Sequence, residues 1–409
     1  MNLKSENFSI MTKLNKKESW VFTACKISTF LLFMDSMYPW YMWNNKLSIL
    51  AKVITIVLFG LLWATEPKQF RITHTLFSSS IIIFISLFWL YLVKLSFFNV
   101  TLTFFSILFP LFLRDKERLL DFITKWFALF LLISWIAYVL YWIGISFSPY
   151  YMTYRDGRYA SMNYYLFIID PSLEDTIRAF RFKSIFMEPG HLTMGLIPLI
   201  MANRFNLRNK YVVILSVIEL FTLSLAGWIT WFVGFFLFNF TLKHLKYLFF
   251  TIVALSFSFY ILEKTGNDEI LDTLIFDRLE VNNGKLAGDN RSGNIDAAFS
   301  HIMQSSDKWF GMQVVDAASL GDSSGYKRFI LDYGLISLIL ILILYTSFLF
   351  IYKKYDIAVI TLILLMLLYQ NGYPYWYCVI LMYILGCENL KKKYKIKNNN
   401  EKNTILSYQ

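Results

Sequence analysis

Apolar segments of roughly 18 to 25 residues, separated by short polar loops, recur along most of the chain. A helix of that length crosses the hydrocarbon core of a bilayer, because each helical residue adds about 1.5 Å. The composition agrees, since 57% of the 409 residues are hydrophobic and only 16% are charged. The pattern predicts an all-α, polytopic membrane protein and not a soluble enzyme of the same length.

The apolar segments divide into about twelve predicted spans. They lie near residues 20–38, 47–64, 75–93, 97–113, 125–145, 190–202, 211–222, 228–241, 247–262, 329–351, 357–368 and 375–386.

The segment Tyr211–Leu242 is too long for one ordinary span and short for two, so its division has to be decided. Ser224-Leu-Ala-Gly227 lies in its middle and predicts a break between two short helices. With this break, the lysines that follow later spans lie on the inner side, as the positive-inside rule expects. These lysines are Lys243, Lys246, Lys353, Lys354 and Lys391 to Lys393.

The same count of spans gives a domain organisation in which both chain ends lie in the cytoplasm and the two long polar stretches share the outer face. Residues 1–145 form the first five spans, 189–262 the next four and 327–388 the last three. Residues 146–188 and 263–326 form the outer loops, and 389–409 a basic tail. The net charge of +11 is spread over short loops and this tail, which predicts membrane orientation and no nucleic-acid partner.

The stretch from Arg178 to Gly195 combines cations with a carboxylate and an imidazole at the start of an apolar segment. The cations are Arg178, Arg181 and Lys183, and an arginine fork matches a phosphate with two hydrogen bonds. A carboxylate at an apolar boundary, here Glu188, suits a general acid or base, and His191 is a second candidate. Simple lipid anchoring, a helix-dipole partner and an interfacial histidine are the respective alternatives.

The first outer loop is also rich in aromatic residues, among them Tyr164 and Tyr165. Aromatic faces stack on sugar rings, and the tyrosine hydroxyl adds a hydrogen bond, so these residues are candidates for a sugar groove. The alternative is an interfacial aromatic belt, which is common at membrane surfaces.

The second outer loop carries Arg278 and Arg291 ahead of an amphipathic run, Asn294–Gln304, for which a helix is predicted. Arg291 at the start of that helix is a second candidate for holding a phosphate, unless it pairs with Asp289 or Asp296. His301 fits a face of the same helix.

Motifs that would hold a metal or a cofactor are missing from the sequence. The chain has no Asp-x-Asp motif, and its four histidines are too scattered for a zinc site. It also lacks a P-loop and a Gly-x-Ser-x-Gly motif. Diphosphate chemistry without a metal or cofactor would therefore depend on arginine and lysine side chains.

Four motifs together resemble those of bacterial O-antigen polymerases, which are relatives of the O-antigen ligases. The first is Arg181-Phe-Lys-Ser-Ile-Phe-Met-Glu188-Pro189, and the second is the break that contains Ser224. The third is Arg291 followed by Trp309-Phe-Gly311, and the fourth is Tyr326 followed by Asp332-Tyr-Gly334-Leu-Ile336. The resemblance covers the layout of spans and roughly residues 178–340 by motif, while the N-terminal third matches only in character.

The resemblance implies a GT-C-like membrane glycosyltransferase that polymerises repeat units linked to polyprenyl diphosphate, such as undecaprenyl diphosphate. It implies the outer face of the bacterial cytoplasmic (inner) membrane, and a lipopolysaccharide O-antigen or a capsule as the product. The ligases carry a His-Asn pair before the exit of the second loop. The matching positions here are Ser323 and Ser324, which argues against a ligase.

The roles expected of individual residues follow from this reading. Arg181 and Arg291 would neutralise the diphosphate, and Glu188 or His191 would deprotonate the acceptor. Residues expected to bind substrate are Arg178, Lys183, Arg278, Tyr164, Tyr165, Ser224 and Tyr326. The expected partners are the lipid-linked oligosaccharide and membrane lipid, and a chain-length regulator protein is kept open.

Two other classes of function remain as alternatives to the polymerase. A flippase or exporter of the lipid-linked oligosaccharide would need charge inside its spans, where Lys26 and Asp35 form the only clear pair of ions. A sugar O-acetyltransferase would need a histidine-rich or acyl-carrying span, which is not found.

Overall fold

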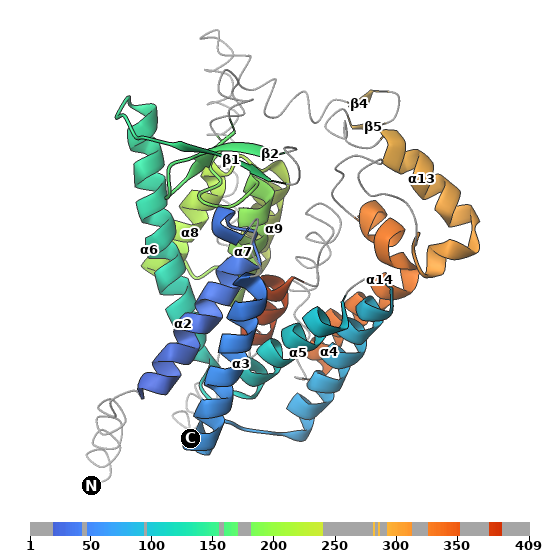
Figure 1. Cartoon of the computed structure of the whole chain (residues 1–409). Helices are drawn as coiled ribbons and strands as arrows, with labels where there is room; N and C mark the ends of the chain where they lie inside the picture. The colour runs from blue at the N-terminus through green and yellow to red at the C-terminus, as the bar shows by residue number, and fades with distance from the viewer. Residues whose placement is uncertain are drawn as a thin grey trace, which may run out of the picture.

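The computed structural model describes residues 19–42, 47–93, 96–154, 159–170, 181–239, 281–282, 285–286, 293–312, 326–351 and 376–386. These residues are mostly helical (Figure 1). The apolar helices are α2 (Trp20–Asp35), α3 (Leu47–Thr65), α4 (His74–Val93), α5 (Phe97–Phe112), α6 (Lys116–Trp142), α7 (Pro189–Ala202), α8 (Lys210–Phe221), α9 (Leu225–Asn239), α14 (Tyr326–Ile351) and an unlabelled helix, Tyr377–Gly386.

Every predicted span that falls on described residues is occupied by one of these helices. The predicted spans 247–262 and 357–368 lie outside the described residues. Three of the helices are long and apolar enough to cross a membrane: Leu47–Thr65, Lys116–Trp142 and Tyr326–Ser347. Several shorter apolar helices accompany them, so the described part of the chain has the character of a membrane protein.

The break predicted in the segment 211–242 is confirmed. Helix α8 ends at Phe221 and α9 begins at Leu225. Leu223 between them has a φ of +47°, the left-handed conformation that ends a helix. Ser224 accepts a hydrogen bond from the Gly227 N–H at 3.3 Å, and it therefore caps the start of α9.

Two helix boundaries differ from the prediction. Helix α6 begins at Lys116, where a loop was expected, because Leu119 and Leu120 are buried on one face of an amphipathic first turn. Helix α14 is interrupted at Gly334, which has φ 78° and ψ 171°, so the predicted span 329–351 consists of two helical pieces.

The all-α description is wrong for the first long polar loop. It forms a three-stranded antiparallel sheet of β1 (Tyr150–Tyr154), β2 (Tyr159–Asn163) and β3 (Ile168–Ile169), in the order β1-β2-β3. Tyrosine, threonine and isoleucine favour extended backbone, which explains why this stretch does not become helical. A second pair of short strands, β4 (Val281–Asn282) and β5 (Lys285–Leu286), lies in the other polar stretch.

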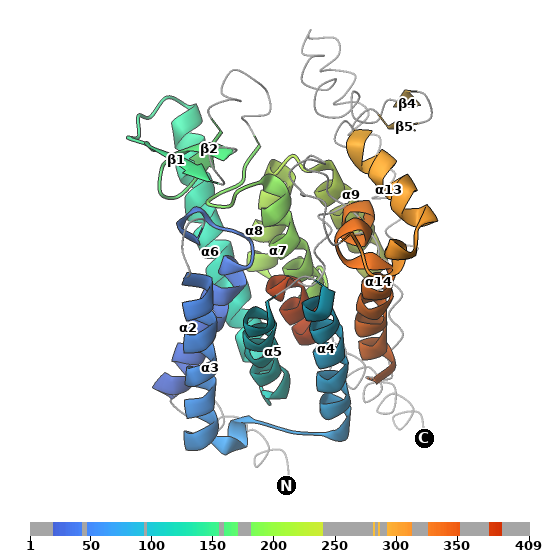
Figure 2. The same ribbon diagram turned by 45° about the vertical axis from the view of Figure 1, so that its right-hand side comes forward.

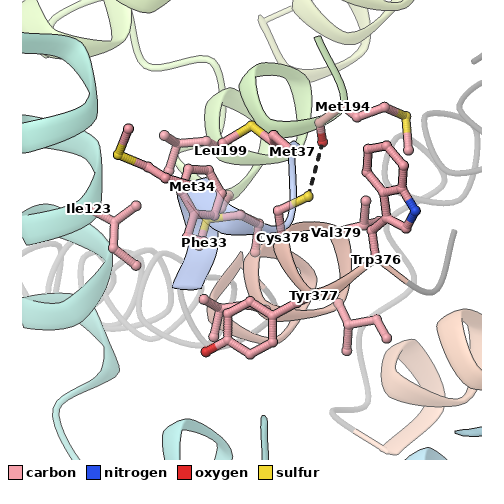
Figure 3. Packing of buried hydrophobic residues seen from close by; sticks show 14 of the residues in the cluster. Phe33, Met34, Met37, Ile123, Met194, Leu199, Trp376, Tyr377, Cys378 and Val379 are labelled. Atoms are coloured by element: carbon pink, nitrogen blue, oxygen red, sulfur yellow. Dashed lines mark hydrogen bonds between the residues drawn. The ribbon is translucent and has the colours of Figure 1, made fainter. Parts of the chain in front are cut away.

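The helix Tyr377–Gly386 lies at the centre of the apolar core (Figure 3). At its start, the Cys378 N–H donates to Ser36 Oγ at 3.1 Å, next to the end of α2. Cys378 also faces the carbonyl oxygen of Met194 on α7, while Gly386 lies against Ala202 at the other end of α7. The helix therefore runs alongside α7 and fixes it within the core.

Both polar regions lie at the same end of the molecule. In Figures 1 and 2 the sheet β1–β2 and the helix α13 (Gly293–Gln304) are at the upper end, whereas α2 begins at the lower end. The two regions are on opposite sides of that end in both views. The described parts of the two polar regions therefore share one end of the molecule, and the outer face predicted for both loops stays a prediction.

The expected pair of ions, Lys26 and Asp35, is not a pair. The Lys26 ammonium lies over the rings of Phe22 and Phe122, with 5.4 Å and 5.0 Å to the ring centroids. Asp35 instead accepts a hydrogen bond from the Ser48 side chain and lies near Lys52 of α3. The two residues are nine positions apart on one helix, which separates them by about 13 Å along its axis.

Candidate functional site

The segment Arg181–Glu188 connects the sheet to α7, and its backbone is held by three other parts of the chain. The Phe182 N–H donates to the carbonyl oxygen of Phe221 at the end of α8, at 3.0 Å. The Ile168 N–H donates to the carbonyl oxygen of Ser184, and the backbone N–H of Trp40 donates to the carbonyl oxygen of Ile185, both at 2.9 Å. These bonds make the segment a fixed part of the fold although it has no regular secondary structure.

Ser184 lies at the centre of this segment and is fully buried. Its hydroxyl shares a hydrogen bond of 2.8 Å with Ser134 of α6, and Ser134 donates to the carbonyl oxygen of Leu166 at 2.7 Å. Ser184 has a φ of +51°, a conformation that costs an L-residue roughly 1–2 kcal/mol. The surrounding hydrogen bonds hold it there.

Lys183 lies among the other charged groups of the segment. Burial lowers the pKa of Lys183 from 10.5 to about 8, and the neighbouring carboxylates of Asp170 and Glu188 oppose that shift. The Arg181 guanidinium adds to the lowering by repulsion. Lys183 therefore lies within electrostatic reach of the predicted residues Arg181 and Glu188, near the start of α7.

Glu188 is the residue that precedes the first turn of α7, and Pro189 starts the helix. The carboxylate of Glu188 makes no capping hydrogen bond to that turn. It is partly buried at the positive end of the helix, where a negative charge is stabilised. The carboxylate is therefore in a place where it can act on a ligand as well as on the helix.

His191 is buried between two aromatic side chains. Its ring centroid is 5.1 Å from that of Trp376 and 5.7 Å from that of Tyr38. Tyr38 belongs to the turn after α2 and has a φ of +57°. This turn is joined to the Arg181–Glu188 segment, because the Met187 N–H donates to the Tyr38 carbonyl oxygen at 3.3 Å. His191 is less open to a ligand than Glu188.

A partly exposed aromatic surface adjoins the segment. The Trp40 indole N–H donates to the carbonyl oxygen of Tyr165 at 3.3 Å, and the Trp40 ring meets Tyr150 edge to face at 6.0 Å. The Tyr150 and Tyr165 rings are 5.3 Å apart, and Tyr165 is 63% exposed. Trp40 was not predicted as a site residue, because the sequence places it in a turn far from the tyrosines.

Tyr164 has a different position from Tyr165 although the two were predicted together. Its ring stacks on Phe167 with 4.7 Å between centroids, and the residue is only 8% exposed. Tyr164 is a core residue that supports the loop and does not present its face outward.

Ser224 lies close to the segment in the fold, because the Phe182 N–H forms its hydrogen bond with the last residue of α8, directly before the break that contains Ser224. Its hydroxyl is used as the helix cap described above, and the residue is buried. Its position therefore favours a structural role over the predicted direct contact with substrate.

Tyr326 is at the start of α14, where its ring meets Phe299 of α13 edge to face at 6.0 Å. This region includes the 3₁₀ turn η8 (Ser306–Trp309), which packs on α13 and α14. Figures 1 and 2 show α13 and α14 across the upper end from β1–β2. The ring contact of Tyr326 is to α13 and not to the Arg181–Glu188 segment. Arg178, Arg278 and Arg291 lie outside the described residues.

One polar residue was missed by the sequence reasoning. Glu219 of α8 is fully buried, and Thr193 Oγ1 of α7 donates to its Oε1 atom at 3.0 Å. The only signal in the sequence is a single carboxylate within the apolar run Ile214–Leu225. Among the described residues, no group of three or more His, Cys, Asp or Glu side chains is placed to hold a metal ion.

Comparisons of the chain with models of protein families, with curated proteins and with solved structures gave no match.

Proposed function

We propose that this protein is a membrane glycosyltransferase that polymerises oligosaccharide repeat units carried on polyprenyl diphosphate. The observation that carries the proposal is that Arg181, Lys183 and Glu188 are grouped near the N-terminus of the apolar helix α7. Two cations beside a carboxylate at such a boundary suit a substrate whose diphosphate is tethered to lipid and whose sugar reacts.

In the proposed reaction, an acceptor sugar hydroxyl attacks the anomeric carbon of the lipid-linked oligosaccharide. A new glycosidic C–O bond forms, and the bond between the anomeric carbon and the diphosphate oxygen breaks. Glu188 takes the hydroxyl proton, a role that its partly buried and uncapped carboxylate fits better than the enclosed His191 ring. Arg181 and Lys183 neutralise the charge that develops on the departing diphosphate.

The exposed ring of Tyr165 and the half-buried rings of Trp40 and Tyr150 would support a sugar of the oligosaccharide beside the diphosphate. The proposal retains a GT-C-like arrangement of about twelve spans. It places the reaction at the outer face of the bacterial inner membrane and gives Arg278 and Arg291 of the second loop a part in binding the diphosphate. It also retains a chain-length regulator protein as a partner.

A reconstitution tests this proposal. Purified protein in lipid vesicles is given lipid-linked repeat units with a metal chelator, and the products are separated by length. The expected result is a ladder of longer glycans that is lost in Arg181→Ala and in Arg291→Ala. Arg118→Ala is the matched control, because Arg118 is an exposed arginine, paired with Asp115, outside the candidate site. An unchanged ladder in Arg181→Ala would reject the assigned role.

A flippase for the same lipid-linked oligosaccharide is the second candidate. The buried carboxyls of Asp35 and Glu219 favour it, since ionisable groups within spans are typical of transporters. In the same vesicles, transfer of the lipid between leaflets without any lengthening of the glycan would support the flippase and reject the polymerase.

A further inference from the structure

Glu219 has the least satisfied carboxyl group among the described residues of the apolar core. Its side chain is fully buried, and Oε1 accepts the hydrogen bond from Thr193. Oε2 has no hydrogen-bond partner, and no cation of the described residues pairs with the group. Burying a carboxyl group with one oxygen unpaired is costly, so the place of Glu219 in the fold depends on the contact that its other oxygen makes.

The fit of Glu219 against α9 depends on Gly227. A Cβ atom at residue 227 would overlap Glu219 Oε1 and would lie 2.8 Å from Thr193 Cγ2. The absence of a side chain at Gly227 therefore lets a carboxyl from α8 and a hydroxyl from α7 meet against the backbone of α9. Three helices come together at this one contact.

The turn that follows Glu219 is held by a chain of hydrogen bonds. The Thr222 hydroxyl donates to the Glu219 carbonyl oxygen at 2.7 Å, and the Ser224 N–H donates to the Thr222 hydroxyl at 3.2 Å. Phe221, within the same turn, accepts the hydrogen bond from Phe182. The end of α8 therefore holds the segment that carries Arg181 and Lys183.

Thr193 connects the same carboxyl to the other half of the site. It lies on α7, less than two turns after Glu188 and about half a turn after His191. A movement of α7 relative to α8 would therefore change the distance between Glu188 and the two cations.

We propose that Glu219 is a positioning residue: its buried carboxyl fixes α7, through Thr193, against the α8–α9 break, and this sets Glu188 relative to Arg181 and Lys183. The catalytic meaning of that geometry rests on the proposed function, while the positioning itself does not. A side chain that keeps an acceptor for Thr193 and fits the same space keeps the geometry.

Four variants test the proposal. Glu219→Gln keeps the shape and the acceptor, Glu219→Ala removes both, and Thr193→Val removes only the hydroxyl at nearly constant volume. Thr230→Val is the matched control. Thr230 is also fully buried, on α9, but its hydroxyl donates to Ala226 of its own helix and to no other helix.

Two measurements are made on each variant, after thermal unfolding has shown that it is folded. The first is polymerisation, from which kcat and KM are obtained. The second is the rate at which an acylating reagent modifies Lys183, followed by mass spectrometry of its peptide. The second measurement reports how the segment is held and does not depend on transferase activity.

The expected result is that Thr193→Val and Glu219→Ala acylate Lys183 severalfold faster and lose kcat by tenfold to about a hundredfold with little change in KM. Glu219→Gln and Thr230→Val should match the wild type in both measurements. If Glu219→Ala does not fold, Thr193→Val carries the test.

Wild-type rates in Thr193→Val would overturn the proposal, and so would a Glu219→Gln variant as impaired as Glu219→Ala. If the wild type polymerises nothing, the proposed function fails, but the acylation rates still decide whether Glu219 positions the segment.

Discussion

Gly334 packs directly against the backbone of Trp309, so that a Cβ atom at residue 334 would overlap the Trp309 carbonyl oxygen. The contact is reciprocal, because a Cβ atom at Gly311 would lie 2.7 Å from the carbonyl oxygen of Asp332. Next to these two contacts, the Met312 N–H donates a hydrogen bond to the carbonyl oxygen of Leu331 at 2.7 Å. Two motifs that are separate in the sequence thus form one joint between η8 and the interrupted helix α14.

Replacing Gly334 by alanine should destabilise the protein by about 2–4 kcal/mol, because it adds a clash with the backbone to the cost of a positive φ. The thermal midpoint of the purified protein in detergent measures the effect. Gly60→Ala is the control, since Gly60 lies inside α3 with nothing within 4 Å of its Cβ position. A similar loss in both variants would contradict the joint.

Leu223 at the α8–α9 break should tolerate asparagine but not valine. Asparagine adopts the left-handed conformation readily, whereas a β-branched residue at a φ of +47° should lose roughly 1 kcal/mol. Thermal unfolding of Leu223→Asn and Leu223→Val checks the order. Equal midpoints would show that the break does not depend on this conformation.

Lys183 should lose its positive charge as the pH rises above about 8. Because burial lowers its pKa to about 8, the amine becomes neutral above that pH, and KM for the lipid diphosphate should rise there. Lys183→Arg should remove this rise, because a guanidinium stays charged. A KM that is constant from pH 7 to 9 in the wild type would contradict a role of Lys183 in binding.

The same lowering of the Lys183 pKa should weaken ligand binding but increase the stability of the folded protein as the pH rises. The folded protein favours the neutral amine, so between a pKa of about 8 in the folded state and 10.5 in the unfolded state the unfolded chain binds more protons. The contribution of Lys183 to the free energy of unfolding should therefore rise as the pH increases from 8 to 10.5. Comparison of thermal midpoints for the wild type and Lys183→Met over this range isolates it.

Trp40→Ala should raise KM for the oligosaccharide by about fivefold, because an aromatic contact of this kind is worth about 1 kcal/mol. The fold of the sheet, which includes Thr153 and Asn163, should be unaffected, because the Tyr150–Tyr154 strand pairs with β2 through residues other than Trp40. Trp126→Ala serves as the control, as Trp126 is an exposed tryptophan on α6 outside the aromatic surface. An equal effect of both substitutions would assign Trp40 to membrane anchoring.

The position of the helices could be predicted from the sequence because burial in an apolar environment depends on local composition. Ser224-Leu-Ala-Gly227 even predicted the break, since small and hydroxyl residues interrupt an apolar run. The sheet was missed because the length and polarity of residues 146–188 indicated a loop, and strand pairing depends on partners such as Tyr150 and Asn163 that the periodicity does not reveal.

Sequence by itself determined the membrane character of this protein and the grouping of Arg181, Lys183 and Glu188, because neighbours in the chain stay neighbours in space. Only the tertiary structure decided which distant residues complete the site. It brought Trp40 to Tyr165, placed Tyr164 in the core and joined Thr193 to Glu219. Such contacts depend on how helices pack side by side, and a helix's own sequence does not specify the face of its partner.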